Sequence, residues 1–331
     1  MINFVPADRW ACGYYRISQV FNALMLSGDY DISLSRPAHY TTQNQNLIYT
    51  QRIAKRDLVD ALIGFKEQTG IEFIVDFDDM IFRSCNGQGM PSYNHHSEKI
   101  DWIGNSESMK DLRALARTVT CSTEFLKKTI SVYYPEEQVH VIPNYLSYKE
   151  WWFPRIKDIP KESTFMFAGS DSHFHNKKKL IGDFSFPLIK FLNEKKVYSK
   201  GTSPFFLNHW FLPPSYLYTY SVDLYRQTRD VKFIIAPLAD NDFNRCKSDL
   251  KYLESAAVGR VCLCSSFDGG PYENVHPLQK IPVNSTYEEI EKIVAEAEKN
   301  YDGILEYQYK YLENRWLENH LDEYKKLLSI A

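Results

Sequence analysis

The sequence lacks several features that would place it in a common class of protein. No apolar run approaches the ~18 residues that a membrane-spanning helix needs. The first residues show no charged segment followed by a long apolar stretch, so we expect no signal peptide. No G-x-G-x-x-G motif follows a strand-like run, which argues against a dinucleotide-dependent oxidoreductase. Internal repeats and low-complexity tails are missing too.

Cysteine and net charge are also scarce. The 6 cysteines among 331 residues show no paired metal-ligand spacing and are too sparse for a disulfide scaffold, so reduced thiols are expected. A formal net charge of -3 gives no general electrostatic case for a nucleic-acid or membrane partner, although it is compatible with a local basic patch. We therefore expect a soluble, cytoplasmic protein.

What the chain does contain is length and apolar content for about two domains, with 44% hydrophobic residues. Apolar strand-like runs alternate with helical patterns, which is typical of doubly wound α/β sheets. The predicted strands lie at residues 2–5, 47–49, 71–75, 118–122, 139–142, 164–168, 233–236 and 261–264. The predicted helices lie at residues 14–27, 57–68, 108–116, 183–194 and 286–299, with one or two more over 301–328. A further helix starts at residues 123–124, and another carries Lys247 and ends at Gly259.

Residues 233–265 combine a strand, a polar loop, a helix ended by Gly259 and a second strand. Lys247, Lys251 and Glu254 are spaced four and three residues apart, so they would share one face near the start of this helix. A helix N-terminus favours anions, and the pattern suits a ligand with phosphates and hydroxyls, such as a nucleotide sugar. The same spacing is typical of a solvated face on which Lys251 and Glu254 pair with each other.

Three acids, Asp76, Asp78 and Asp79, follow the apolar run 71–75. Ligands of open α/β sheets bind at this end of the strands. Asp76 and Asp78 also match a D-x-D motif that binds a divalent ion in another glycosyltransferase architecture. Metal binding, hydrogen bonds to sugar hydroxyls and capping of the next segment all remain open for these carboxylates.

The first strand leads to Gly13 and then to a helix that Gly28 ends. Gly13 fits either a close approach to a ligand or an ordinary turn. Arg16, one turn into the helix, is compatible with a position in a cleft or in solvent. Residues 84–99 form a polar loop whose role the pattern leaves open.

The order of the motifs resembles the GT-B glycosyltransferases, and the retaining family 4 group most closely. The matching segments, which cover most of the chain, are CGYYRI, IVDFDD, VTCSTEFLKKTI followed by VHVIPN, FAGSDSH, and IAPLADNDFNRCKSDLKYLESAAVGR. The resemblance implies two Rossmann-like domains that face each other across a cleft. They would span residues 1–145 and 163–300, with a linker at 146–162 and terminal helices at 301–331 that pack back on the first domain.

The resemblance also implies roles for single residues. Glu254 matches the second acid of the E-x7-E motif, which holds the donor ribose, whereas the first acid falls at Cys246. Lys247 and Ser248 sit where this group contacts the donor diphosphate. The further donor-side positions are Gly13, Gly169, Ser170, His173 and Lys251. The catalytic candidates are Asp78, Asp79 and Lys247, and the acceptor-side candidates are Arg16 and Asp76.

For the reaction, the resemblance implies a UDP-sugar or similar nucleotide-sugar donor, retention at the anomeric carbon, and no required cofactor or metal. The acceptor class stays open. Phages of the T-even type carry members that glycosylate 5-hydroxymethylcytosine in DNA, for which residues 177–179 (three lysines) and the aromatic segment 203–217 would supply a surface. Lipid-linked or surface glycans and proteins are the other acceptors. A nucleotide-sugar epimerase and a non-catalytic sugar-nucleotide-binding module are the alternatives from other classes.

Overall fold

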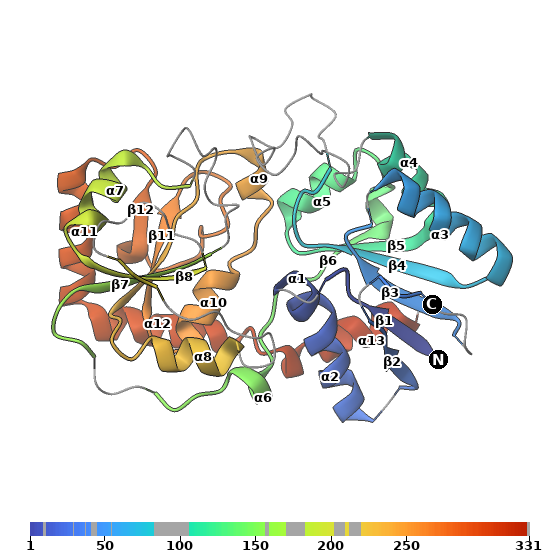
Figure 1. Ribbon diagram of the computed structural model, residues 1–331, viewed down its shortest axis with the longest axis horizontal. Coiled ribbons are helices and arrows are strands. Elements are labelled where there is room, and N and C mark those ends of the chain that lie inside the picture. Colours follow the sequence, from blue (N-terminus) through green and yellow to red (C-terminus); the bar gives the residue numbers. More distant parts are fainter. Residues whose placement is uncertain are drawn as a thin grey trace. The chain divides into compact units, whose positions relative to one another are not determined.

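The computed structural model describes residues 1–8, 11–28, 30–36, 38–40, 45–53, 55–82, 106–155, 159–169, 183–201, 209–211 and 220–329. The chain forms two compact units, each built on a six-stranded sheet (Figure 1). The N-terminal unit comprises Met1–Ser147, Arg245–Ser248 and Leu317–Ala331. The C-terminal unit comprises Tyr148–Asn244 and Asp249–Trp316. The short segment 245–248 thus belongs to the first unit, although both of its neighbours in the chain belong to the second.

The N-terminal sheet is parallel throughout, in the order β2-β1-β3-β4-β5-β6. Its strands are β1 (Ile2–Val5), β2 (Ile32–Leu34), β3 (Leu47–Gln51), β4 (Glu72–Phe77), β5 (Ala116–Cys121) and β6 (Val139–Val141). The central strands β3 and β4 are almost wholly buried, which explains their continuous apolar character. The three-residue edge strands β2 and β6 are more exposed.

Helices cover both faces of this sheet. They are α1 (Ala11–Gly13), the π-helical turn η1 (Tyr14–Ser18), α2 (Gln19–Ser27), α3 (Arg56–Thr69), α4 (Ser106–Leu115), α5 (Glu124–Ile130), the 3-10 turns η3 (Glu136–Gln138) and η7 (Leu317–Asn319), and α13 (Leu321–Ser329). Residues of α2 and α13 share one core with β1 and β3, through Leu24, Tyr324, Phe4 and Tyr49. The C-terminal end of the chain therefore completes the N-terminal core.

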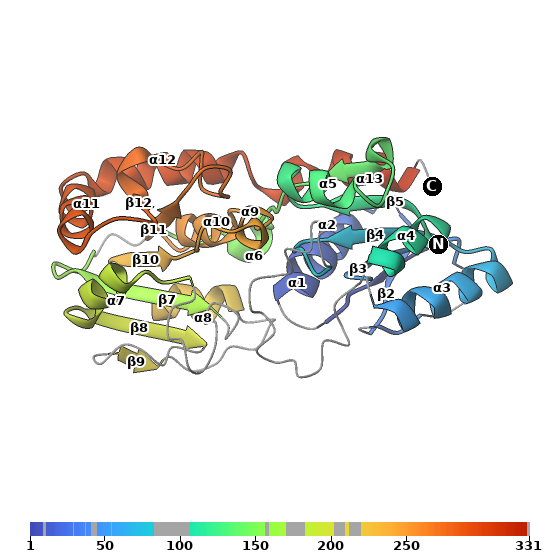
Figure 2. The same ribbon diagram turned by 90° about the horizontal axis from the view of Figure 1, so that it is seen from above.

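The C-terminal sheet is also parallel, in the order β12-β11-β10-β7-β8-β9, and Figure 2 shows its strands side by side. Its strands are β7 (Thr164–Gly169), β8 (Lys196–Gly201), β9 (His209–Phe211), β10 (Phe233–Ala236), β11 (Val261–Ser266) and β12 (Lys280–Pro282). Its helices are α6 (Tyr148–Trp151), α7 (Phe186–Asn193), α8 (Tyr220–Gln227), α10 (Leu250–Ala257), the 3-10 turn η6 (Pro277–Gln279), α11 (Tyr287–Lys299) and α12 (Tyr301–Glu313), while α9 (Asp242–Arg245) ends in the segment 245–248.

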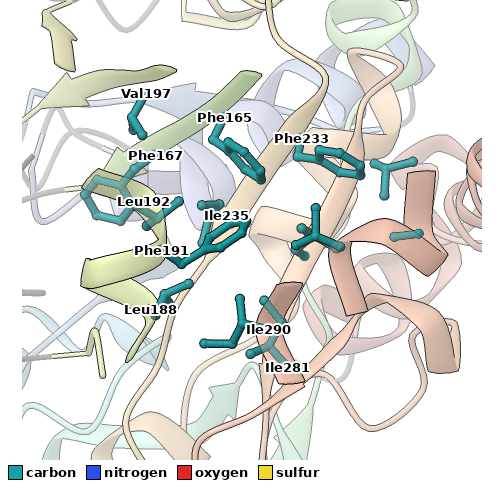
Figure 3. Close-up of a cluster of buried hydrophobic side chains, with 14 of the residues drawn as sticks. Phe165, Phe167, Leu188, Phe191, Leu192, Val197, Phe233, Ile235, Ile281 and Ile290 are labelled. Carbon is teal, nitrogen blue, oxygen red and sulfur yellow. The ribbon is translucent and has the colours of Figure 1, made fainter. Parts of the chain in front are cut away.

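Aromatic side chains dominate the core of this second sheet. Phe165 on β7 and Phe233 on β10 stack with ring centroids 5.5 Å apart, and Phe191 of α7 meets Phe165 edge-on at 5.6 Å. Figure 3 shows these rings together with Leu188 and Ile235 in one cluster. Rings in these geometries stabilise the core beyond the area that they bury.

The terminal segment differs from the expectation in one respect. We expected residues 301–331 to pack back on the N-terminal domain as one piece. Instead α12 packs in the C-terminal core through Tyr301, Ile304 and Leu305, and only α13 packs in the N-terminal core. The physical reason is that the apolar side chains of α12 lie in the same hydrophobic core as those of α11. None of the helices in the described part of the chain has the length and apolar character that crossing a membrane requires.

Candidate functional site

Charged side chains gather where the strands of the N-terminal sheet end. β3 is followed by Arg52, and β4 is followed by Asp78 and Asp79. Because β3 and β4 are parallel neighbours, these residues lie at the same edge of the sheet. This carboxyl edge is where doubly wound sheets bind ligands. We therefore take it as the candidate site of the N-terminal unit.

Arg52 balances two acids at this edge. Its backbone is left-handed, with a φ of 59°, which is uncommon for residues other than glycine. Its N–H donates to the carbonyl of Asp76 at 2.8 Å. The guanidinium lies 3.6 Å from Asp8 and 3.9 Å from Asp78. Burial raises the pKa of Asp78, and the charge of Arg52 opposes that rise. Arg52 therefore partly offsets the effect of burial on this carboxyl.

Cys12, Asp78 and Asp79 have the spacing of a cation site, since their ligand atoms all lie within 4.8 Å of one another. Their environment fits a metal poorly. Burial raises the pKa of the Cys12 thiol, which keeps it protonated, whereas metals bind the thiolate. Arg52 and Lys247 each pair with one of the two carboxylates, at 3.9 and 3.6 Å. This arrangement favours hydroxyl-bearing ligands over a divalent ion.

Arg16 and Asp76 form a buried ion pair beneath this edge. Arg16 is 1% exposed and Asp76 is 0% exposed. The guanidinium donates to both carboxylate oxygens, with Nε at 2.9 Å from Oδ1 and NH2 at 2.6 Å from Oδ2. Thr120 also donates to Asp76, at 2.6 Å.

This burial corrects two expectations. Arg16 does not face solvent, because its guanidinium donates to Asp76, Ile142 and Asn144 inside the unit, and these contacts leave neither Arg16 nor Asp76 placed to touch an acceptor. Asp76 is likewise engaged with Arg16 and Thr120, so it is not available as the first ligand of a D-x-D metal site. The physical reason is the position of Asp76 inside β4, where its side chain points into the layer of helix η1.

The segment 245–248 is attached to the N-terminal unit by polar contacts. The hydroxyl of Thr123 donates to the carbonyl of Cys246 at 3.1 Å, and the amide of Asn144 donates to Oγ of Ser248 at 2.6 Å. Lys247 pairs with Asp79 at 3.6 Å. These contacts bring Lys247 and Ser248, the two predicted diphosphate ligands, to the edge that carries Asp78 and Asp79.

Cys246 stands where the resemblance in the sequence predicted the first acid of an E-x7-E motif. Its side chain is fully buried, with Sγ 3.9 Å from the hydroxyl of Thr129. A carboxylate in this place would be cut off from water, at a large cost in free energy. The position therefore serves as packing in this protein.

The expected stripe of Lys247, Lys251 and Glu254 on one helix is wrong. α10 begins at Leu250, so Lys247 precedes the helix and belongs to the N-terminal unit. The N-cap of α10 is Asp249, an acid whose carboxylate is held by Arg315 at 3.0 Å. A negative charge already lies at this helix N-terminus, which disfavours the anion site expected there.

Lys251 and Glu254 do share a face of α10, and they pair with each other. Lys251 Nζ lies 2.8 Å from Glu254 Oε2 and 3.4 Å from the hydroxyl of Tyr220. Burial would lower the pKa of Lys251, but the adjacent carboxylate of Glu254 raises it above its ordinary value. Burial and the same carboxylate raise the pKa of Tyr220 to about 12. Glu254 therefore favours the charged form of Lys251, and Glu254 itself is 3% exposed.

The remaining donor-side predictions concern Gly13, Gly169, Ser170 and His173. A Cβ added at Gly13 would lie 2.2 Å from the carbonyl oxygen of Asp8, so tight packing inside the unit accounts for this glycine. Gly169 ends β7 at the carboxyl edge of the C-terminal sheet. Ser170 and His173 lie outside the described residues, as does the loop 84–99.

Sequence reasoning missed Arg52, Asn144, Cys12 and Asp8. Arg52 and Asn144 each follow a predicted strand within three residues, and Asn144 also ends the matching segment VHVIPN. Cys12 lies in α1 and begins the matching segment CGYYRI, which gave it no role, and Asp8 lies between β1 and α1, outside every matching segment.

The comparisons with known proteins support the fold. No family model and no curated protein sequence matches the chain. Among solved structures, it is similar to a glycosyltransferase from Rickettsia africae ESF-5 with a TM-score of 0.63 and 12% identity, covering 100% of this chain and 98% of that one. It is similar to Anabaena Alr3699/HepE in complex with UDP with a TM-score of 0.61 and 11% identity, covering both chains fully, at 100%.

The lipopolysaccharide outer core galactosyltransferase WaaB is a third similar structure, with a TM-score of 0.55 and 11% identity over 98% of this chain and 99% of that one. At these identities the likeness concerns the fold. Together with the two parallel sheets, it shows that the chain has the GT-B fold, as the sequence predicted.

Proposed function

We propose that the protein is a glycosyltransferase that moves a sugar from a nucleoside-diphosphate sugar, with a UDP-sugar as donor, to a hydroxyl acceptor with retention of configuration. The observation that carries the proposal is the full-length likeness to HepE, a protein crystallised with UDP and also with UDP-glucose. The polar contacts that hold Lys247 and Ser248 at the carboxyl edge of the N-terminal sheet support it.

In this reaction the bond between the anomeric carbon and the diphosphate breaks, and negative charge grows on the departing oxygen. We assign Lys247 and Ser248 to that charge, because a fixed cation and a hydroxyl donor stabilise it without reorganisation. The acceptor oxygen forms the new bond on the face that the diphosphate leaves, and its proton passes to the departing phosphate. Asp79 has a supporting role, since its carboxylate holds Lys247.

Glu254 is assigned to the ribose of the donor. Its carboxylate can accept hydrogen bonds from two ribose hydroxyls. One of its oxygens already accepts from Lys251, so ribose and Lys251 would share the group. Lys251 then contributes to donor binding indirectly, by holding the carboxylate of Glu254.

The acceptor has two proposed classes. The first is 5-hydroxymethylcytosine in DNA, following the resemblance of the sequence motifs. The surface proposed for it, residues 177–179 and 203–217, lies mostly outside the described residues. The second is a glycan, favoured by the likeness to the lipopolysaccharide galactosyltransferase WaaB. A DNA acceptor would require base flipping and would bind less tightly as salt increases.

The test is release of UDP from a panel of UDP-sugars, with hydroxymethylated DNA or glycans as acceptors and product stereochemistry read by NMR. Acceptor-dependent release with retention supports the proposal, and the productive acceptor selects the class. Sugar isomerisation without an acceptor would show an epimerase, and UDP-sugar binding without turnover in any arm would show a binding module. Activity is expected to survive EDTA, because Arg52 and Lys247 already balance the acids.

Lys247→Ala is expected to lower kcat/KM about 100-fold, as loss of one donor to a developing oxyanion does in other enzymes. Glu254→Gln is expected to raise KM for the donor about tenfold, as loss of a charged hydrogen-bond acceptor does. Matched controls are Lys299→Ala and Glu288→Gln, which alter exposed residues of α11. Near wild-type kinetics for both site variants would contradict the assignment.

A further inference from the structure

A continuous chain of hydrogen bonds runs from the buried core of the N-terminal sheet to Ser248. Asp76 accepts from Arg16 at 2.6 Å. NH1 of Arg16 donates to Oδ1 of Asn144 at 3.1 Å, and Nδ2 of Asn144 donates to Oγ of Ser248 at 2.6 Å. All four residues belong to the same compact unit. Asn144 is 5% exposed, and Ser248 is partly exposed.

The direction of each hydrogen bond in this chain is fixed by chemistry. A guanidinium only donates, so the atom of Asn144 that faces Arg16 must be the amide oxygen. The amide nitrogen then faces Ser248 and must donate, because an amide nitrogen has no acceptor capacity. The Ser248 oxygen is therefore the acceptor, and its own hydroxyl hydrogen is left to point elsewhere. Among the described residues, Asn144 is the hydrogen-bond partner of that hydroxyl.

Arg16 is itself held firmly in this orientation. Besides Asp76 and Asn144, NH1 donates to the carbonyl oxygens of Ile142 at 2.6 Å and Pro143 at 3.3 Å. These carbonyls lie in the backbone that leads from β6 to Asn144. The guanidinium thus fixes both the loop that carries Asn144 and the orientation of the Asn144 amide.

We propose that Asn144 is a positioning residue, oriented by the Arg16–Asp76 pair, that makes the Ser248 hydroxyl a donor toward an anionic oxygen of the donor diphosphate. The inference rests on the proposed function, and it adds to that function the residues that set the polarity of Ser248. Asn144 occupies one of the two lone pairs of the Ser248 oxygen and, as a donor, cannot take up its hydrogen, so the hydroxyl can present that hydrogen to the ligand. The charge-assisted hydrogen bond that results is stronger than a neutral one.

The test measures UDP binding by calorimetry with four variants. Ser248→Ala is expected to weaken binding about tenfold, the loss of one hydrogen bond to a charged group. Asn144→Ala is expected to weaken it by a similar factor. The double variant is expected to bind no more weakly than Ser248→Ala alone, because the two residues act through one hydroxyl. Asn144→Asp keeps an acceptor for Arg16 but draws the Ser248 hydrogen to itself, so it should bind UDP most weakly.

The matched control is Gln19→Ala. Gln19 is 1% exposed and supports the same loop, donating to the carbonyl of Tyr145 at 2.7 Å and accepting from the N–H of Ser147 at 3.2 Å. It makes no contact with Ser248 in the described structure. If Asn144 only stabilised the loop, Gln19→Ala would weaken UDP binding equally. The inference therefore requires that Gln19→Ala bind UDP as the wild type does.

The outcomes separate this inference from the proposed function. Wild-type binding by Asn144→Ala, or additive losses in the double variant, would overturn the inference while leaving a UDP-binding protein. Wild-type binding by Ser248→Ala would overturn both the inference and the diphosphate assignment of Ser248. A wild-type protein that binds no UDP would overturn the proposed UDP-sugar donor, and the inference with it.

Discussion

Two of the arginines that the structure describes are buried, one in each unit, and they differ in what surrounds them. Arg16 in the N-terminal unit is 1% exposed and faces the carboxylate of Asp76. Arg260 in the C-terminal unit is 0% exposed, and its donors go to the carbonyl oxygens of Thr228 at 2.8 Å, Gly259 at 2.9 Å and Arg229 at 3.2 Å. Among the described residues it has no carboxylate partner.

The pKa values follow this difference. Burial favours the neutral form of both guanidinium groups. For Arg16 burial is opposed by the charge and hydrogen bond of Asp76 together with the nearby tyrosines Tyr324 and Tyr49, and its pKa is raised, whereas burial lowers the pKa of Arg260. Arg260 precedes β11, at the amino edge of the C-terminal sheet, whereas Arg16 reaches the loop after β6 at the carboxyl edge of the N-terminal sheet. An arginine thus ties backbone segments together in both units, and in the N-terminal unit those segments lie at the carboxyl edge of the sheet.

The largest expected effect comes from breaking the charged pair. Asp76→Ala leaves the Arg16 charge buried without its carboxylate, which typically costs about 3–5 kcal/mol of unfolding free energy. Urea denaturation would measure it. The control is the double variant Arg16→Met/Asp76→Leu, which removes both charges and should regain much of this stability while binding UDP weakly. A double variant as unstable as Asp76→Ala would show that packing, not charge, dominates.

A smaller effect is expected at Arg260. Arg260→Met leaves the carbonyl oxygens of Thr228, Gly259 and Arg229 without this donor but removes an unpaired buried charge, so we expect a loss of about 1–3 kcal/mol. UDP affinity should stay at the wild-type value, because Arg260 lies at the other edge of its sheet. Reduced UDP affinity in a folded variant would remove the functional contrast between the two arginines.

The smallest effect concerns Asp78 and depends on pH. Burial raises its pKa in the folded protein, so the folded state binds a proton more tightly than the unfolded chain. The stability linked to Asp78 is full below its unfolded pKa of about 3.9 and is lost as pH rises through the folded pKa. Asp78→Asn should therefore melt at a slightly higher temperature than the wild type at pH 7, and the difference should vanish in acid. An unchanged difference across pH would contradict this origin.

Much of the fold was predictable from the sequence because buried parallel strands and capped helices have strong local signals. The strand predicted at residues 71–75 is β4 at Glu72–Phe77, and the helix predicted at residues 57–68 is α3 at Arg56–Thr69. β2, β8, β9 and β12 were missed. β2, β9 and β12 span three residues each, and β8 has only two adjacent apolar residues among lysine, serine and glycine, whereas the short β6 was found because the apolar Ile142 extends its run.

The site was less predictable because its contacts join distant parts of the chain. Arg16 and Asp76 are sixty residues apart, and Asn144 and Ser248 more than a hundred. Local spacing placed Lys247 on a helix with Lys251, although the packing of Cys246 draws Lys247 to the other unit. No local sequence pattern indicates that the end of β6 lies beside residue 248.

The buried cysteines offer a way to measure how often each of the two sheets opens locally. Among the described residues, Cys121 and Cys246 are buried in the N-terminal unit, and Cys262 and Cys264 in the C-terminal unit. A thiol reagent reaches such groups only when the surrounding packing opens. The rate at which each peptide becomes alkylated therefore reports the local opening of its own sheet, in a protein that carries no added label.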